Sequence, residues 1–357
     1  MDKRWRVAAG CGLIGCIFLV VQLGALALVD PFQTAGYQAV EDPSDPTNSV
    51  VYIGAILLAT GGMLLAFRYD ADQLIRGLIV FSSAWLSLYI FRLFVPPVVD
   101  VAGVNVPAIG LAALLGLALL VYPEWYVIDT AGAVMGAAAA GLFGISFGIL
   151  PALLLLSVLA VYDAISVYGT EHMLTLASGV MDLKIPVVLV IPLSLSYSYL
   201  DAATPDPTED GADTDDGEAG THTDDGGREH AGARDGPTPE TGGGESPPED
   251  ETGGADPLDR DALFIGLGDA IIPTILVASA AFFAPAGVRT ILGVPLPALT
   301  AMIGTFAGLA VLLWMVLKGR AHAGLPLLNG GSIAGYLLGA TAAGIGLVDA
   351  VGLAPYV

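Results

Sequence analysis

The chain has 357 residues, of which 55% are hydrophobic, and a formal net charge of −22. Its mean hydropathy of +0.73 excludes an ordinary soluble domain and is typical of a polytopic membrane protein. The negative charge is compatible with this class, because 20 of the 35 Asp and Glu residues fall between residues 201 and 261. An acid-rich, Lys-poor surface suits a strongly salted cytoplasm, so we expect a halophilic source.

The reactive residue types exclude several kinds of site. Cys11 and Cys16 share one apolar run and indicate neither a disulfide framework nor a Cys-rich metal site. The four His residues have no metal-ligand spacing, and the sequence contains no phosphate loop and no basic patch. We therefore expect no metal, no organic cofactor and no nucleic-acid partner.

Nine apolar stretches are long enough to cross a bilayer as helices. The first, residues 7–29, exceeds the core of a signal peptide, which favours a retained helix. The others are residues 50–67, 74–95, 104–122, 127–148, 150–168, 262–284, 294–317 and 325 to about 348. The predicted fold class is an all-α polytopic membrane protein of nine transmembrane helices, located in the cell membrane.

The chain divides at a long hydrophilic insertion. Residues 1–200 are predicted to form a membrane region with helices one to six and an interfacial segment. Within it, residues 185–200 contain Pro186 and Pro192, so we expect an extended or re-entrant segment there instead of a tenth helix. Residues 201–261 are low-complexity and predict a disordered acidic cytoplasmic loop, and residues 262–357 predict a second membrane region with helices seven to nine.

Lys and Arg residues predict the orientation of this arrangement. If the N-terminus is cytoplasmic, 11 of the 13 Lys and Arg residues lie on the cytoplasmic side, and only Arg92 and Arg289 lie outside. We therefore expect the N-terminus and the acidic loop in the cytoplasm and the C-terminus outside.

Asp163 lies among apolar residues in the sixth stretch, and Asp269 does so in the seventh. An ionised side chain at such a position costs about 3 kcal/mol or more, so it needs a partner or a function. Each lies about seven residues from the cytoplasmic end of its predicted helix, which puts both roughly 10 Å below that surface. The two acids are therefore expected to face each other.

Adjacent carboxylates in a medium of low dielectric constant cannot both ionise, so they share a proton. The ionised member can take a proton from a water that attacks a peptide carbonyl, while the protonated member donates to the developing oxyanion or the leaving amine. Because the pair titrates as a unit, neither role is assigned to Asp163 or Asp269. Gly266 and Gly268, beside Asp269, allow a substrate backbone or a neighbouring helix to approach closely.

These motifs resemble the presenilin and signal peptide peptidase family of GxGD intramembrane aspartyl proteases, in its archaeal form. The resemblance rests on Tyr162-Asp163, on Gly266-Leu267-Gly268-Asp269, and on Pro326-Leu327-Leu328 where the family has Pro-Ala-Leu. It implies that Asp163 and Asp269 are catalytic, and that the other residues of the three motifs shape the site and bind substrate. It also implies cleavage of transmembrane proteins or peptides in the lipid bilayer, with a preference for substrates whose N-terminus lies outside.

Two other functions remain open at this stage. A prepilin-peptidase-like aspartyl protease also uses a Gly-x-Gly-Asp motif, but its second Asp normally lies in a short Gly/Asp segment, unlike Asp163. An ion-coupled transporter could use the buried Asp pair as a proton or cation site, although the sequence has no internal repeat. The oligomeric state is unknown.

Overall fold

The computed structural model describes residues 3–69, 71–101, 103–168, 185–194, 197–200, 262–318 and 323–356. The helices of these ranges are α1 (Lys3–Thr34), α2 (Thr47–Arg68), α3 (Asp72–Phe94), α4 (Val106–Val121), α5 (Trp125–Ser146), α6 (Ile149–Tyr168), α8 (Leu267–Phe282), α9 (Leu296–Val316), α10 (Gly324–Ala342), α11 (Leu347–Ala350) and a 3-10 turn at Ala354–Tyr356. The strands form three antiparallel pairs: β1 (Asp100–Val101) with β2 (Val104–Asn105), β3 (Val188–Pro192) with β4 (Ala262–Gly266), and β5 (Thr290–Ile291) with β6 (Val294–Pro295).

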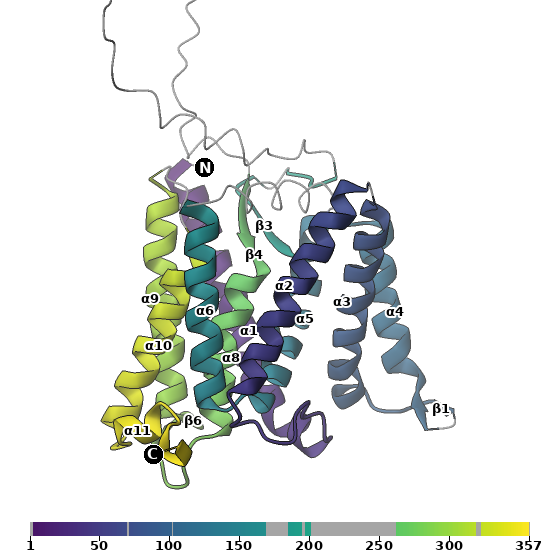
Figure 1. Cartoon of the computed structure of the whole chain (residues 1–357). Helices are drawn as coiled ribbons and strands as arrows, with labels where there is room; N and C mark the ends of the chain where they lie inside the picture. The colour runs from purple at the N-terminus through teal and green to yellow at the C-terminus, as the bar shows by residue number, and fades with distance from the viewer. Residues whose placement is uncertain are drawn as a thin grey trace, which may run out of the picture.

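The long helices form one bundle whose two ends carry different elements (Figure 1). The N-terminus and the β3–β4 hairpin lie at one end, and the C-terminus, α11, β1 and β6 lie at the other. Helices α6, α9 and α10 stand together on one side of the bundle, and α3 and α4 stand on the opposite side. The bundle thus places the hairpin at the end where α1 begins.

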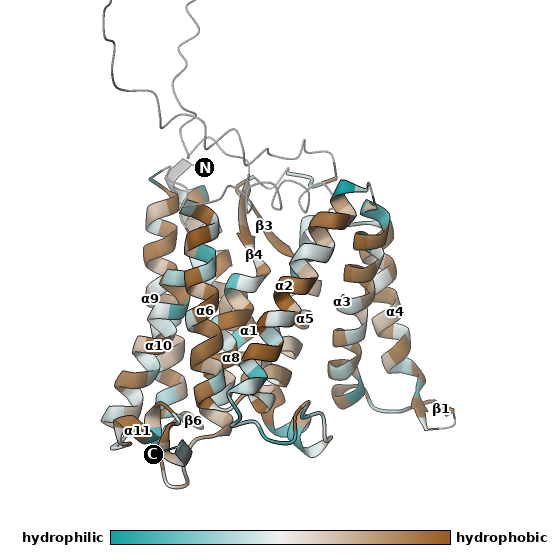
Figure 2. Cartoon of the chain, viewed as in Figure 1, coloured by the Kyte–Doolittle hydropathy of each residue, from teal (hydrophilic) through white to brown (hydrophobic). Residues whose placement is uncertain are grey.

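The surface of the bundle is apolar in a way that fits a bilayer. Six helices (α1, α2, α3, α5, α6 and α9) are long and apolar enough to span a membrane, and α4 and α8 are shorter apolar helices. Large hydrophobic side chains face outward, including Leu58 at 79% exposure and Leu338 at 69%. Hydrophobic colour dominates the helix bodies in Figure 2. The chain is therefore an integral multi-pass membrane protein.

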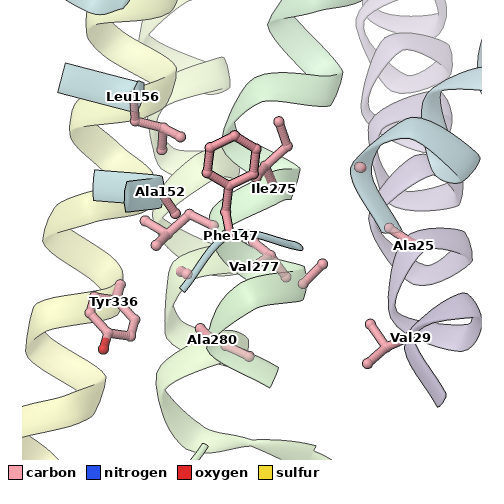
Figure 3. Close-up of a cluster of buried hydrophobic side chains, with 14 of the residues drawn as sticks. Ala25, Val29, Phe147, Ala152, Leu156, Ile275, Val277, Ala280 and Tyr336 are labelled. Atoms are coloured by element: carbon pink, nitrogen blue, oxygen red, sulfur yellow. The ribbon is translucent and has the colours of Figure 1, made fainter. Parts of the chain in front are cut away.

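Small residues let the central helices pack closely around α5. The Gly- and Ala-rich stretch of α5 is mostly buried, and a Cβ on Gly144 would stand 2.3 Å from the Cβ of Ala278 in α8. The largest core cluster is completed by side chains from α1, α6, α8 and α10, among them Leu156, Ile275 and Tyr336 (Figure 3). This core fixes α8 against α5 and α6.

The seventh apolar stretch departs from the predicted continuous helix. Residues 262–266 form strand β4, which pairs antiparallel with β3. Val188 of β3 lies opposite Gly266, and Pro192 lies opposite Ala262. Helix α8 begins only at Leu267. Gly266, with φ −59° and ψ 131°, provides the extended residue that precedes the helix. Consequently Asp269 lies in the first turn of α8, not two turns inside a helix. The extended conformation expected within residues 185–200 is confirmed by β3.

Other helix boundaries differ by shorter segments. The predicted helix 104–122 begins at Val106, because residues 104 and 105 pair with β1 and the Asn105 side chain accepts from the Ala108 amide at 3.2 Å. The last predicted helix ends at Ala342, and Gly344 follows with a φ of +81° before α11. The described residues are thus mostly helical, and the all-α expectation is wrong at three short hairpins. The acidic segment 201–261 lies outside the described residues.

Candidate active site

Asp163 lies in the last two turns of α6 and contacts the beginning of α10. Its side chain is only 5% exposed, and its Oδ2 accepts a hydrogen bond of 3.0 Å from the backbone N–H of Leu325. No side chain within α10 caps this helix start, so the N–H groups of its first turn need outside acceptors. A hydrogen bond to a charged acceptor contributes about 1.5–3 kcal/mol, which offsets part of the cost of burying Asp163.

Asp269 approaches the same helix start from the other side. The residue as a whole is half-buried in the first turn of α8, and a Cβ on Gly324 would stand 2.9 Å from Asp269 Oδ2 and 3.2 Å from Oδ1. The charges of Asp163 and Asp269 are close enough to interact. The two carboxylates therefore flank the Gly324-Leu325 turn, and the positive end of the α10 dipole favours one negative charge there.

The end of α6 holds the beginning of α10 at further points. The Tyr168 hydroxyl accepts from the backbone N–H of Ala323 at 3.3 Å, one residue before α10. Deeper in the bundle, Asn329 Nδ2 donates to the Leu156 carbonyl at 2.9 Å. These contacts fix α10 along α6, so the relation of Leu325 to Asp163 is set by more than one hydrogen bond.

The other residues of the two Asp motifs differ in their surroundings. Tyr162 is 36% exposed on α6. Leu267 is 3% exposed and packs against α5, where its Cδ1 lies 3.5 Å from the position of a Cβ on Gly132. Gly266 and Gly268 are exposed, and an added Cβ would meet its nearest atoms at 3.6 and 3.8 Å. A larger side chain would therefore fit at both positions, so steric crowding does not explain the two glycines.

The third motif forms the first turns of α10. Pro326 lies in the first turn, where its missing N–H leaves no helical hydrogen bond unmade, and Pro326 and Leu327 are both half-buried. Leu328 is fully buried in the core with Leu309 and Leu312 of α9. Leu328 therefore packs in the core beneath the first turn of α10.

Sequence reasoning did not select Gly324, although a Cβ at this residue would meet the Asp269 carboxylate. The signal was present, because a glycine directly precedes the Leu-Pro-Leu-Leu run. That glycine becomes informative only once the structure shows that two acids meet at this turn. The role of Tyr168 had no comparable signal, since a Tyr at the end of a membrane helix is ordinarily an interfacial anchor.

Two carboxylates that flank one helix start inside an apolar helical bundle define a membrane-embedded site of the aspartyl protease class. The chain belongs to the family described as "Signal-peptide peptidase, presenilin aspartyl protease", which matches residues 15–345. Membership of this family makes the chain an intramembrane aspartyl protease, which is a hydrolase, and the resemblance stated from the motifs is confirmed.

Two solved structures are similar to the chain over most of its length. One, titled a structure of a presenilin family intramembrane aspartate protease in C222 space group, is 31% identical with a TM-score of 0.59, covering 93% of this chain and 99% of that chain. Another, titled in the same way for the P2 space group, is 29% identical with a TM-score of 0.55, covering 92% and 96%. No curated protein matches the chain. The comparisons support neither the prepilin peptidase nor the transporter.

Proposed function

We propose that Asp163 and Asp269 are the catalytic pair and that they hydrolyse peptide bonds of transmembrane proteins or peptides within the bilayer. The observation that carries this proposal is that both carboxylates meet one turn, Gly324-Leu325. Asp163 accepts a hydrogen bond from the Leu325 N–H, and Asp269 lies next to Gly324, which has no side chain. Half-buried Asp269 and exposed Gly266 leave one side of the pair open to a substrate. Tyr162, Gly268 and the Pro326–Leu327 turn border the same region.

The chemistry uses one proton shared by the pair. The ionised carboxylate removes a proton from water, and the water oxygen bonds to the carbonyl carbon while the protonated carboxyl donates its proton to the carbonyl oxygen. The resulting gem-diol intermediate collapses: the C–N bond breaks, the leaving amine takes the proton held by the pair, and one hydroxyl of the intermediate gives its proton back to the pair as the new carboxyl group forms. The products are a new carboxyl end and a new amino end, and the pair returns to its single-proton state.

Replacing either acid tests this assignment. Asp163→Asn and Asp269→Asn each remove the shared proton chemistry while nearly preserving size, so each should reduce cleavage of a single-span peptide in liposomes by about 10⁴-fold or more. Asp72→Asn, an equal change at an exposed position of α3, is the control and should cleave normally. Normal cleavage by a folded Asp163→Asn or Asp269→Asn protein would assign that residue a structural role.

We also propose that nine helices cross the membrane, with the N-terminus in the cytoplasm and the C-terminus outside. The alternation of the loops between the two ends of the bundle supports this topology, as does the distribution of Lys and Arg. In this orientation the membrane regions 1–200 and 262–357 are joined by a cytoplasmic acidic segment. Substrates with an outside N-terminus are the expected preference, by analogy with the family.

Cysteine labelling tests the orientation. In a chain with Cys11 and Cys16 replaced by Ala, a membrane-impermeant maleimide added to intact cells should label Glu41→Cys, in the loop after α1. It should label Tyr69→Cys, in the turn after α2, only after permeabilisation. Both side chains are exposed, so accessibility to water does not distinguish them. The opposite pattern would reverse the topology, and labelling of both from outside would mean that α2 does not cross.

A further inference from the structure

Asp129 is a buried carboxylate that the catalytic chemistry does not use. It lies in the second turn of α5 and is 7% exposed. Its Oδ1 accepts a hydrogen bond of 2.8 Å from the backbone N–H of Val190, and its Oδ2 has no hydrogen-bond partner among the described residues. Its surroundings are apolar: the cluster beside it includes Ile128, Ala131 and Val190. A carboxyl group is costly in such a place, so its contact with Val190 requires an explanation.

Val190 is the central residue of β3, and its contact with Asp129 lies on the edge of β3 that faces away from β4. In the hairpin, Val190 is opposite Phe264, and β4 continues without a loop into α8. The Leu267 N–H also donates to the Val187 carbonyl at 2.7 Å, which ties the first residue of α8 to the β3 side of the hairpin. Asp269 follows two residues later. A displacement of β3 is therefore transmitted directly to Asp269.

The chain that follows β3 is held at two further points by charged side chains. Glu124, the N-cap residue of α5, accepts from Ser198 Oγ at 2.6 Å and from the Tyr199 N–H at 3.1 Å. Burial raises the pKa of Glu124, but these hydrogen bonds outweigh burial and leave the pKa below its ordinary value. At the far end of β3, Arg6 Nε donates to the Leu193 carbonyl. Of these three side chains, only Asp129 binds a residue within β3 itself.

We propose that Asp129 is a positioning residue, which holds β3 on α5 and thereby sets the place of Asp269 opposite Asp163. The proposal rests on the proposed function of the Asp pair and goes beyond it, because it makes a third side chain, acting as a hydrogen-bond acceptor, necessary for the geometry of the two acids. Asp129 acts here as a hydrogen-bond acceptor for one strand amide. An uncharged acceptor of the same shape should therefore replace it, and an apolar side chain of the same size should not.

Two substitutions separate the acceptor from the charge. Asp129→Asn keeps an oxygen at the Val190 N–H, so kcat for a single-span peptide in liposomes should stay within about threefold of wild type. Asp129→Leu removes the acceptor and should reduce kcat about 100-fold with KM changed by less than about threefold, because displacement of a catalytic group by about 1 Å has an effect of that size. Thr130→Val, at an exposed neighbouring position of α5, is the control and should behave as wild type.

A second measurement follows the strand itself and does not depend on activity. Amide hydrogen exchange, analysed by mass spectrometry, should show faster exchange across residues 188–192 in Asp129→Leu and unchanged protection in Asp129→Asn and Thr130→Val. The exchange of α9 and α10 should remain unchanged in all three. If wild type itself cleaves no transmembrane peptide, the proposed function fails, but the exchange comparison still decides whether Asp129 holds β3.

Several outcomes would overturn the proposal. Wild-type kcat in Asp129→Leu would show that the acceptor is not needed. Equal losses of kcat in the Leu and Asn variants would show that the charge matters and not the acceptor. If Asp129→Leu does not fold, Asp129→Ala, which adds no bulk, takes its place in the comparison. Failure of both to fold, or a fall in protection throughout the bundle, would assign Asp129 to general stability and not to positioning.

Discussion

At the scale of single residues, the site depends on Gly324 having no side chain. Gly324 lets the Asp269 carboxylate approach the first turn of α10, where a Cβ would stand 2.9 Å from Oδ2. At an approach below 3.0 Å, either the Asp269 carboxylate or α10 has to move. The cost falls on the geometry of the acid pair more than on the fold.

Gly324→Ala should therefore reduce kcat by roughly tenfold or more while the protein remains folded. The matched control is Gly330→Ala in the same helix, where an added Cβ meets nothing within 4 Å and activity should be retained. Cleavage of a single-span peptide and thermal unfolding in detergent check both statements. Equal activity of the two variants would show that the space at Gly324 is not needed.

The two acids could be predicted from sequence, and their surroundings could not. Asp163 and Asp269 stand out because ionisable residues in apolar membrane stretches are rare and costly. Asp129 lies in a predicted helix as well, but its position near the start of the stretch resembles an ordinary interfacial acid. Its contact with Val190 joins residues 61 positions apart, which no local pattern reveals.

At the scale of elements, α9 and α10 are in direct backbone contact. A Cβ on Gly304 would stand 2.0 Å from the Gly331 carbonyl oxygen, and a Cβ on Gly335 would stand 2.1 Å from the Thr300 carbonyl oxygen. The signal for this contact was in the sequence as glycines four residues apart, at 304 and 308 and again at 331, 335 and 339. This contact sets the position of α10 and therefore of the Leu325 N–H.

Substitutions at this contact should affect stability and activity together. Gly304→Ala and Gly335→Ala should each destabilise the protein by about 1–3 kcal/mol, because an overpacked interface must separate, and each should also reduce cleavage. Denaturant unfolding in mixed micelles and the peptide assay measure the two effects. Wild-type stability in both variants would mean that the helices can separate without cost.

The start of α8 could not be predicted from periodicity alone. Residues 262–266 are apolar and are followed by further apolar residues, so the pattern predicts one continuous helix. Pairing with β3 overrides that pattern and makes Ala262 to Gly266 a strand. This pairing changes the expected place of Asp269, from two turns inside a helix to the first turn of α8.

At the scale of the whole molecule, the chain segments on either side of the acidic insertion form one packed unit. Ser279 Oγ of α8 donates to the Phe147 carbonyl at 2.8 Å, and Asn329 of α10 binds the Leu156 carbonyl of α6. Each acid of the proposed pair comes from a different segment. The bundle core, not the covalent connection through residues 201–261, therefore brings the acids together.

A chain divided within the insertion should consequently reassemble. Fragments 1–230 and 231–357, expressed together, should copurify through a tag on one of them and should cleave the single-span peptide at a rate within about tenfold of the intact chain. Each fragment expressed alone is the control and should be inactive, because it carries only one acid. Absence of copurification would show that the connection is needed to hold the segments together.

The sequence predicted the large-scale organisation better than its details. Each of the nine apolar stretches overlaps one of the helices α1 to α6 and α8 to α10, because the length and composition of a membrane helix are strong signals. The number of helices that cross the bilayer stays a prediction, because only six of the described helices are both long enough and apolar enough to span it. The β3–β4 pair was missed because its two strands are distant in sequence, whereas β1–β2 and β5–β6 are pairs of two-residue strands, too short to give a pattern.

The hydrogen bond from the Leu325 N–H to Asp163 links the protonation state of Asp163 to the stability of the first turn of α10. A carboxylate attracts the N–H groups and the dipole at a helix start more strongly than a neutral acid does. In whichever half of the cycle Asp163 holds the shared proton, the first turn of α10 is therefore held less firmly. In the proposed mechanism, each turnover therefore loosens this turn while Asp163 holds the proton and restores it when Asp163 ionises, so the order of the Gly324-Leu325 turn follows the protonation state of the pair.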